Sequence, residues 1–343
     1  MRNSKHTTIE DIARAVGVST ATVSRAFSGS PRVGVDTRER VLRIARQMHY
    51  EPSNLARALS TRRTSTIGVV VEDIANPFFV EVAKGIERVC EAENNTMLIA
   101  SSDWQLEKES KILRKLLRQR VDGVIVATID PDSEANRQLK ASGMPMVLLN
   151  WLCIDGSVSS VSTDNREGGM LAARHSLARA VDRVVCLVGF PHQSSFDRLE
   201  GFMSVVTMEN PRRVPHELYR GVHTAADGYD VVPRLLADAA GARLGVCACN
   251  DLVAMGVIEG LLDHGIRVPD RICVCGYDDI AFAGKFRVPL TTVAQPMRQM
   301  GDLAANELFR LIREPQSPPR QLVLPPRLVV RESCPAVPPA VPG

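Results

Sequence analysis

The sequence predicts two kinds of structure in one chain: an all-α head of about 60 residues, followed by an α/β body with two doubly wound parallel sheets. The first 50 residues carry apolar side chains at helical spacing. From residue 66 onward, short runs rich in Val, Ile and Leu alternate with amphipathic stretches, which is the pattern of parallel strands joined by helices. With 343 residues, 45% of them hydrophobic, the chain can build sizeable cores in both parts.

Two short helices joined at Gly17 are expected within residues 8–28. Thr8 and Ser19 stand where a side-chain oxygen can cap the first turn of each helix, and Gly17 permits the sharp turn between them. The apolar residues of the first helix recur at i, i+3, i+4 and i+7, the spacing of one buried face. These residues are Ile9, Ile12, Ala13 and Val16. Val18 can fill the angle between the helices, and Val23 with Ala26 and Phe27 continues the buried stripe.

Small and hydroxylated residues remain on the outer side of the second helix, together with Arg25. A helix that enters the major groove of DNA needs short side chains near its N-terminus and a long donor for a guanine edge. This layout is that of a DNA-reading helix-turn-helix, although an ordinary helical hairpin with a solvated face is the alternative. Charge favours the first interpretation, because residues 1–63 hold twelve Lys and Arg against five Asp and Glu. The expected DNA contacts of the head are Thr8, Ser19, Thr20, Ala21, Thr22, Ser24, Arg25 and Arg32.

A third helix over residues 36–49 would complete the core of the head, and Pro52 would end it. Its expected buried stripe is Val41, Leu42, Ala45 and Met48. Residues 53–60 then offer about one and a half turns of helix, which is too short to be stable alone in water. Such a segment could form when docked on DNA and would then act as a hinge.

In the body, seven apolar runs are expected to be parallel strands, and the chain crosses between the two halves near residues 289–296 and 327–333. The strands are residues 66–71, 97–101, 122–127, 146–150, 183–189, 243–250 and 271–278. Ligands of open parallel sheets bind at the carboxyl ends of the strands. The residues that follow the strands are therefore the candidate ligand contacts.

The strand ends carry aromatic and hydrogen-bonding side chains. Phe78 and Phe79 could lie against a ligand, although two core rings would fit the pattern equally well. Asn150 and Trp151 can bring an amide and a ring into the same cleft, whereas Trp104 is expected to pack on the surface. Asn250 and Asp278 end two later strands, and a carboxylate such as Asp278 can accept from two vicinal hydroxyls. Asp251 is expected to cap the helix that begins at Leu252 instead.

Several longer motifs resemble the lac and galactose repressor family of bacterial transcription regulators. The headpiece and hinge of that family resemble TIEDIARAVGVSTATVSRAFSG and TRERVLRIARQMHYEPSNLARALSTRRT. The resemblance continues along almost the whole chain, through TIGVVVEDIANPFFVEVAKGIE, DGVIV, STDNREGGMLAARHSL, FDRLEGFM, NDLVAMGV, VCGYDDIAF and PLTTVAQPMRQMG. It implies a body with the periplasmic-binding-protein fold and a ligand cleft between its two halves.

The resemblance also implies particular contacts. Arg198 would face the cleft and donate to ligand oxygens, with His192 and Ser194 in the loop just before it, although a surface ion pair is the alternative for Arg198. His223 takes the position at which purine-binding members carry an aromatic ring, which argues against a base stacked in the same way. In the hinge, the implied DNA contacts are Asn54, Arg57 and Leu59, of which the leucine would wedge into the minor groove.

The expected regulator is a homodimer that binds a pseudo-palindromic double-stranded DNA operator, with repression favoured over activation by the resemblance. Its effector would be a small molecule, a sugar or a sugar acid, and no cofactor is expected. The head would span residues 1–63 and the body residues 64–333. The body would divide into one subdomain of residues 64–163 and 293–324 and another of residues 164–291 and 325–333. Residues 334–343, which are rich in proline, would form a disordered tail.

Other classes of protein fit the sequence less well. No G-x-S-x-G, H-E-x-x-H, P-loop or G-x-G-x-x-G motif occurs, so catalysis is not expected. The eight cysteines include two C-x-C pairs, residues 247/249 and 273/275, whose spacing is not that of zinc sites; buried free thiols are expected, and no metal. A periplasmic solute receptor is the alternative function, but the basic head and the lack of a signal sequence favour a cytoplasmic DNA-binding protein.

Overall fold

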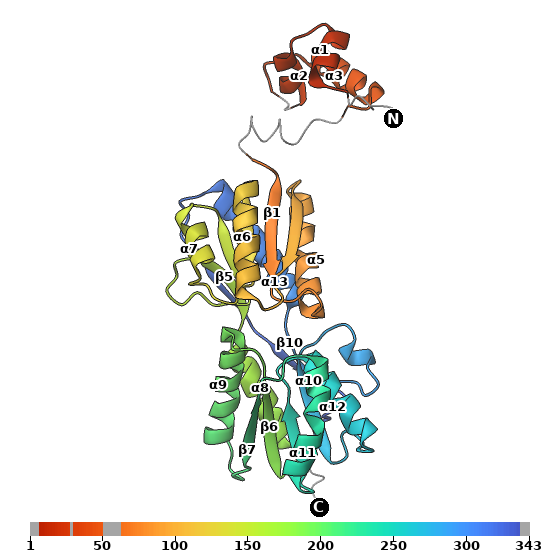
Figure 1. Cartoon of the computed structure of the whole chain (residues 1–343), viewed down its shortest axis with the longest axis vertical. Helices are drawn as coiled ribbons and strands as arrows, with labels where there is room; N and C mark the ends of the chain where they lie inside the picture. Colours follow the sequence, from red (N-terminus) through yellow and green to blue (C-terminus); the bar gives the residue numbers. More distant parts are fainter. Residues whose placement is uncertain (1–6, 28–29, 51–62, 337–343) are drawn as a thin grey trace, which may run out of the picture. The chain divides into compact units, whose positions relative to one another are not determined.

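The structure is a computed structural model that describes residues 7–27, 30–50 and 63–336 (Figure 1). It contains two compact units, Met1–Ser65 and Thr66–Gly343, which are described separately here. The first unit is the head and the second is the body.

Three helices build the head, and each boundary has a local cause. They are α1 (Ile9–Val16), α2 (Thr20–Phe27) and α3 (Val35–Gln47). Thr8 caps α1 by accepting from the amide of Asp11, whose carboxylate accepts from the Thr8 amide in return. Gly17 ends α1 in the left-handed region, at φ 75°, and Ser19 Oγ accepts from the amide of Thr22 at the start of α2. These features confirm the helix-turn-helix expected from the sequence.

The core of the head differs from expectation at one position of α3. Val41 and Ala45 are buried, with Ile44 and Met48 packed against them, so the buried stripe runs at i, i+3, i+4 and i+7 from Val41. Leu42, which was expected in this stripe, is only half-buried and lies outside the core cluster. Ile44, which was not expected in the stripe, packs against the core cluster that α3 forms with α1 and α2.

The body contains two six-stranded sheets in the orders β11-β5-β4-β3-β1-β2 and β12-β10-β9-β8-β6-β7. All neighbouring strands are parallel except β12, which runs antiparallel to β10. The first sheet consists of β1 (Thr66–Val71), β2 (Thr96–Ser101), β3 (Gly123–Val126), β4 (Met146–Leu149), β5 (Ser159–Thr163) and β11 (Gln321–Leu324). The second consists of β6 (Arg183–Val188), β7 (His216–Arg220), β8 (Leu244–Cys247), β9 (Ile272–Asp278), β10 (Thr291–Ala294) and β12 (Arg327–Val329).

Helices cover both faces of each sheet, as a doubly wound fold requires (Figure 1). The first sheet with α5 (Pro77–Ala92), α6 (Leu106–Gln119), α7 (Glu134–Ala141) and α13 (Met297–Arg313) is called the first subdomain. The second sheet with α8 (Asn165–Ala178), α9 (Gln193–Met208), α10 (Ala225–Asp230), α11 (Val232–Ala239), α12 (Asp251–Asp263) and the short 3₁₀ helix Ala283–Lys285 is called the second subdomain. The predicted fold class is confirmed.

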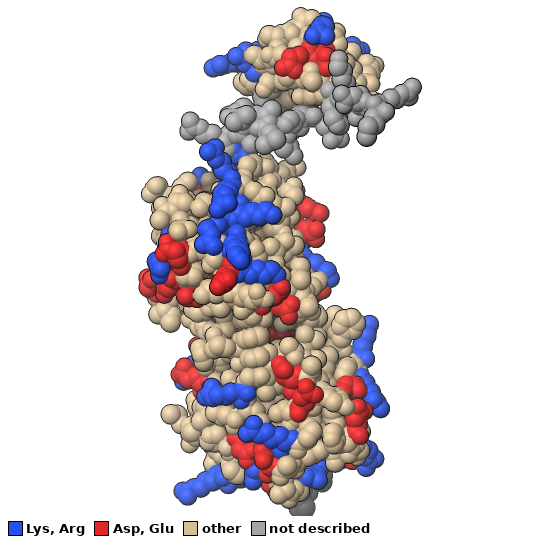
Figure 2. Space-filling view, viewed as in Figure 1, with Lys and Arg blue, Asp and Glu red and all other residues tan. Residues whose placement is uncertain are grey.

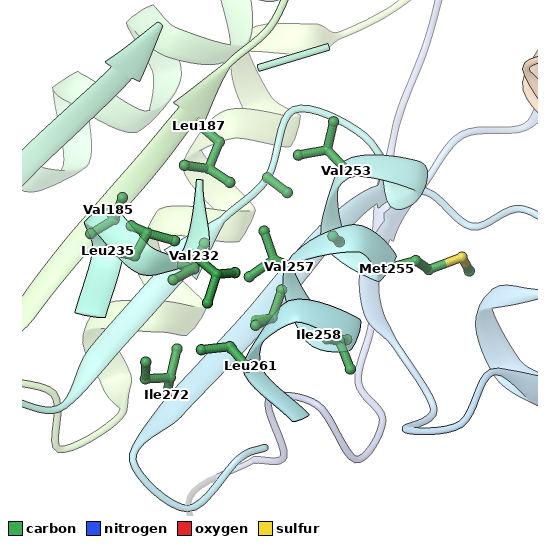
Figure 3. Packing of buried hydrophobic residues seen from close by; sticks show 14 of the residues in the cluster. Val185, Leu187, Val232, Leu235, Val253, Met255, Val257, Ile258, Leu261 and Ile272 are labelled. Carbon is green, nitrogen blue, oxygen red and sulfur yellow. The ribbon is translucent and has the colours of Figure 1, made fainter. Parts of the chain in front are cut away.

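Each subdomain has its own apolar core. On one face of the second sheet, α12 directs Val257 and Leu261 toward Val232 of α11 and Ile272 of β9 (Figure 3). On the opposite face, α8 and α9 cross so closely that a Cβ added at Gly201 would lie 1.9 Å from the carbonyl oxygen of Arg166. The cores make each half rigid, and the polar residues at the strand ends are left between the halves.

Five strands lie outside the seven predicted ones: β5, β7 and β11 were missed, and β10 and β12 lie in segments interpreted as crossings. Of these, β5 and β7 are rich in polar residues. β5 is fully buried although it reads Ser-Ser-Val-Ser-Thr, because its hydroxyls have partners: Ser159 Oγ donates to Glu307 and Ser160 Oγ to Gln321. β7 lies at the edge of the second sheet and carries an alternating polar sequence. Apolar runs alone therefore underestimate the strand content.

The chain crosses between the subdomains after Thr163, after Ala294 and after Leu324. The sequence analysis began the second crossing at residue 293, but Val293 and Ala294 still pair with β9. The predicted disordered tail also began too early. Cys334 is fully buried, and its carbonyl oxygen accepts from His175 Nε2 and Thr291 Oγ1, so Cys334 belongs to the core of the second subdomain.

All eight cysteines are free, and Cys186, Cys247 and Cys275 are register partners across three neighbouring strands. Among the described residues, no group of His, Cys, Asp or Glu has the arrangement of a metal site. Lys and Arg gather over α6, whose opposite face buries Leu113 and Leu116 (Figure 2). Over the same described ranges, no helix has the length and apolar character needed to span a membrane.

Candidate ligand cleft and candidate nucleic-acid interface

A cleft of about 330 Å³ lies between the two subdomains, at the carboxyl ends of strands from both sheets. Both subdomains contribute to its lining. The lining residues of the first are Asp73, Ala75, Asn76, Phe78, Phe79, Trp104 and Asn150, and the remainder are Gly189, Phe190, Ser194, Ser195, Arg198, His223, Thr224, Ala225, Cys249, Asn250, Leu252, Asp278 and Gln295. Eight of the ten expected ligand contacts are in this lining. The other two, Trp151 and His192, are not.

Aromatic rings form much of the wall. Phe78 and Phe79 meet edge to face at 5.0 Å between ring centres, and they line the cleft while being almost fully buried in the core. Both alternatives considered for these rings therefore hold at once. Phe190 lies between Trp104 and His223, stacked on each at 4.2 Å and 3.7 Å.

Trp104 is a correction, because the sequence analysis placed it on the surface. The loop after β2 turns through the left-handed region at Asp103 and Trp104, and the Trp104 amide donates to the carbonyl oxygen of Glu72 at the end of β1. This bond draws the indole toward the cleft. No local sequence pattern encodes such a loop.

Trp151 and His192 lie behind the lining. Trp151 packs against the core on the α6 face of the first sheet and meets the His192 ring edge-on at 5.0 Å. His192 is 2% exposed and caps α9, because its Nδ1 accepts from the amide of Ser194. The structure thus places these two rings as support for the cleft wall.

Arg198 projects from α9 and is held by three contacts. Its Nε donates to Asn165 Oδ1 at 2.8 Å, its Nη1 donates to the carbonyl oxygen of Cys249 at 2.7 Å, and its guanidinium lies 3.6 Å from the centre of the Tyr277 ring. The surface ion pair considered for Arg198 does not form. Because Nε–H and one of the two Nη1–H groups are already used inside the protein, the second Nη1–H and the two Nη2–H groups are left for a ligand.

Asp278 ends β9 with φ 118°, in a region that side chains other than glycine rarely adopt. It is almost fully buried, and its Oδ1 accepts from Gln295 Nε2 at 2.7 Å. Burial raises the pKa of Asp278 to about 6, while Arg198 and the Gln295 bond oppose that shift. The carboxylate is therefore ionised near neutral pH and has one oxygen left for a ligand.

Three buried atoms of the lining have no hydrogen-bond partner within the described part of the chain: Asn150 Oδ1, Gln295 Oε1 and His223 Nδ1. Burial lowers the pKa of His223, so its ring is neutral near pH 7. The two amide oxygens can only accept hydrogen bonds, and Asp278 adds a third acceptor. Two of the three buried unpartnered atoms of the lining are therefore obligate acceptors, and they lie beside the Asp278 carboxylate.

Asn250 takes the capping role that was expected of Asp251. Asn250 caps α12, because its Oδ1 accepts from the amide of Val253 at 2.8 Å, although it still lines the cleft. Asp251 is fully buried and accepts from the amide of Ile280 and from Thr292 Oγ1. It supports the strand ends and does not cap the helix, since the helix begins one residue earlier than expected.

Sequence reasoning missed Phe190 and Gln295. Each follows a strand, β6 and β10 respectively, so the rule that located the other candidates applied to them as well. Gln295 lies in a segment interpreted as a crossing, and Phe190 lies in the loop from which the polar residues His192 and Ser194 were predicted.

In the head, the expected DNA-reading side of α2 is open to solvent. Thr20, Ala21, Ser24 and Arg25 are exposed, and Thr22 is half-buried because its hydroxyl pairs with that of Ser19. The other expected contacts, Thr8, Ser19 and Arg32, are also exposed. The expected hinge contacts Asn54, Arg57 and Leu59 lie outside the described residues.

A helix-turn-helix head joined to a two-subdomain α/β body with a ligand cleft defines a class of ligand-responsive DNA-binding proteins. The comparisons agree with that class. Residues 8–53 match the family described as bacterial regulatory proteins, lacI family, and residues 173–334 match the periplasmic binding protein-like domain. The ribose operon repressor of Haemophilus influenzae is 31% identical over 327 residues, 95% of this chain and 98% of that protein. The HTH-type transcriptional repressor PurR of Aliivibrio fischeri is 32% identical over 329 residues, with the same shares covered.

Solved structures show the same relationship. A lac repressor dimer bound to operator and the anti-inducer ONPF has a TM-score of 0.85 at 25% identity and covers 97% of this chain and all of that one. A LacI family transcriptional regulator from Enterococcus faecium with bound ribose has a TM-score of 0.70 at 32% identity and covers 80% of this chain and all of that one. The chain belongs to the LacI family of bacterial transcription regulators. It is a DNA-binding repressor controlled by a small effector, and not an enzyme.

Proposed function

We propose that this repressor binds a pseudo-palindromic operator as a homodimer, and that its effector is a neutral polyhydroxylated molecule of pentose or hexose size. The single observation that carries the effector class is the excess of unpartnered acceptors in the cleft: Asn150 Oδ1 and Gln295 Oε1, next to the Asp278 carboxylate. Buried acceptors require donors, and the hydroxyl groups of a sugar supply them. A volume of about 330 Å³ suits a small ligand.

A sugar acid fits the same cleft less well. The cation that would receive a carboxylate is Arg198, and its Nε and Nη1 already donate to Asn165 and Cys249. The side-on carboxylate pair through Nε is therefore closed, and only an end-on pair through Nη1 and Nη2 remains. An anion would also lie near Asp278. The structure therefore favours the neutral member of the two effector classes expected from the sequence.

A flat purine base is also disfavoured. His223, at the position where an aromatic platform would be needed, is already stacked on Phe190 at 3.7 Å between ring centres. The relatives include both possibilities by name, a ribose operon repressor and PurR, and one structural neighbour contains ribose. Because Phe190 already covers the His223 ring, no free platform is left for a base, and this stack supports a sugar as the effector.

The ligand residues proposed here are Phe78, Phe79, Asn150, Ser194, Arg198, His223, Asn250 and Asp278, with Trp104, Phe190 and Gln295 added by the structure. In the head, Arg25 and the exposed residues of α2 read the operator, and the hinge contacts Asn54, Arg57 and Leu59 stay predictions. The effector can change the operator affinity only if it binds two states of the body with different affinities. A bacterial DNA-binding regulator acts in the cytoplasm, at the nucleoid.

Thermal unfolding of the full-length protein with a ligand panel tests the effector class. We expect D-ribose or another neutral aldose to raise the midpoint, because a ligand that binds only the folded state stabilises it. Neither D-gluconate nor hypoxanthine should do so at the same concentration. Asn150→Leu should lose the response, whereas Asn94→Leu, at an exposed position after α5, should keep it. A midpoint raised by D-gluconate or hypoxanthine alone would contradict the proposal.

A further inference from the structure

A cluster of polar residues that the effector site does not use joins the two subdomains behind the cleft. His192, which precedes α9 in the second subdomain, directs its Nε2 toward the first subdomain. There it lies 3.2 Å from the carbonyl oxygen of Thr128, after β3, and 3.4 Å from Oε1 of Glu72, after β1. Both His192 and Glu72 are buried, at 2% and 0% exposed.

A second contact in the same loop supports the first. The side chain of Gln193 accepts from the amide of Leu152 at 2.6 Å and donates to the carbonyl oxygen of Leu152 at 3.0 Å. Gln193 belongs to the second subdomain and Leu152 to the first, so these bonds exist only while the subdomains are together. The indoles of Trp104 and Trp151 meet the His192 ring edge-on and exclude water from it.

Glu72 is the unusual member of the cluster. Neither of its carboxylate oxygens has a hydrogen-bond partner among the described residues. A buried charge without partners is costly, so such a group stays neutral by holding a proton. The charged groups that face it are Glu109 of α6, Arg198 of α9 and the adjacent Asp73; the two carboxylates disfavour ionisation of Glu72, and Arg198 favours it.

We propose that Glu72, Thr128, Leu152, His192 and Gln193 form a proton-linked latch: closure of the cleft takes up one proton from water at Glu72, and opening returns it. In the closed body, the His192 Nε2–H donates to Thr128, and Glu72 can approach that ring only as the neutral acid. In an open body, water would solvate Glu72, and its carboxylate would ionise at the ordinary pH. This latch goes beyond the proposed effector class and would operate with any ligand of the cleft.

The direction of the pH dependence follows from two groups with opposite shifts. Burial raises the pKa of Glu72 from 4.5 to about 8 in the closed body, whereas burial lowers the pKa of His192 from 6.5 to about 4. Between pH 4.5 and 6.5, closure binds a proton at Glu72 and releases one at His192, so the two effects cancel. Above pH 6.5 the Glu72 effect dominates, and the ratio of closed to open protein falls by about eightfold in all between pH 6.5 and 8.

Hydrogen–deuterium exchange of the Leu152 amide measures this ratio in the ligand-free, full-length protein without DNA. That amide is protected by Gln193 across the subdomains, whereas the neighbouring Asn150 amide donates to Val161 within the first sheet and serves as the internal reference. After correction for intrinsic rates, we expect the protection of Leu152 to fall about eightfold between pH 6.5 and 8, with little change at Asn150.

Two variants and one control separate the latch from general effects of pH. In Glu72→Gln, the protection of the Leu152 amide should no longer fall between pH 6.5 and 8. It should instead decrease as the pH is lowered below 6.5, where His192 becomes protonated in the open body. His192→Gln keeps a donor toward Thr128 but cannot titrate, so the protection of the Leu152 amide should begin to fall near pH 4.5 instead of pH 6.5. Glu107→Gln, which neutralises an exposed carboxylate of α6, should behave as the wild type.

The proposal is overturned if Leu152 is unprotected at every pH, if wild-type protection does not change between pH 6.5 and 8, or if Glu72→Gln shows the same fall as the wild type. If Glu72→Gln fails to fold, the shifted onset in His192→Gln decides the matter alone. Because no ligand or operator enters the experiment, its failure would leave the proposed effector class untouched.

Discussion

Replacing Arg198 with methionine should destabilise the body strongly, because this side chain ties three elements together. The change removes the donors to Asn165 Oδ1 and to the Cys249 carbonyl oxygen and the stack on Tyr277. Hydrogen bonds from charged donors contribute about 1.5–3 kcal/mol each, and a partly desolvated guanidinium over a ring contributes about 1 kcal/mol. Methionine keeps much of the apolar volume, and Tyr277 Oη still donates to Asn165 Oδ1. We therefore expect a loss of about 3–5 kcal/mol in the free energy of unfolding.

Urea unfolding followed by far-ultraviolet circular dichroism measures this loss. With a urea dependence of about 3 kcal/mol per molar, the midpoint of the body transition should fall by about 1 M or more. Arg198→Lys keeps the charge and one donor group, so its urea midpoint should lie between those of Arg198→Met and the wild type. Arg166→Met removes an exposed ion pair with Glu200 and should change stability by less than about 0.5 kcal/mol. If Arg198→Met unfolds at the wild-type midpoint, the three contacts do not hold the cleft wall and the reasoning fails.

Three further predictions concern the head, the hinge and the helix packing. Arg25→Ala should lose about 1–3 kcal/mol of discrimination at one base pair per half-site, measured on operators varied at each position, and an unchanged base preference would remove Arg25 from base reading. Leu59→Ala should lose DNA bending and the preference for a flexible central step if the leucine wedges there; retained bending in a dimeric variant would leave it a packing role between hinges. Gly201→Ala should lower the thermal midpoint by the equivalent of about 1–3 kcal/mol, because the new Cβ meets the Arg166 carbonyl oxygen, while Gly34→Ala, with open space around it, should not.

Patterns of local sequence were sufficient for the helix-turn-helix and for most of the strands. Thr8, Gly17 and Ser19 act on backbone groups within a few residues of themselves, so their roles can be predicted without tertiary information. Two of the strands that were not predicted, β5 and β7, depend on partners distant in the sequence, such as the Glu307 carboxylate that satisfies Ser159. Burial of a polar strand is visible only when such partners are in place.

In the cleft too, some residues could be predicted from the sequence and others depend on tertiary contacts. The rule that ligand residues follow parallel strands predicted eight residues that line it, including Asn150 and Asp278. It could not place Trp104, whose position depends on a left-handed loop, or separate Asn250 from Asp251 as the helix cap. It also could not show that Arg198 has two of its donors occupied. That occupancy depends on tertiary contacts, and it supports the preference for a neutral effector over a sugar acid.

Operator binding by the full-length protein, with and without the sugar that stabilises it most, tests the central claim most directly. The operator is the sequence that the protein selects from a random DNA pool, and binding is followed by fluorescence anisotropy at fixed salt. The account predicts that the neutral sugar changes operator affinity by about 5- to 150-fold. It also predicts that Asn150→Leu binds operator like the wild type but no longer responds. An operator affinity that no neutral sugar changes, or that D-gluconate or hypoxanthine changes instead, would contradict it.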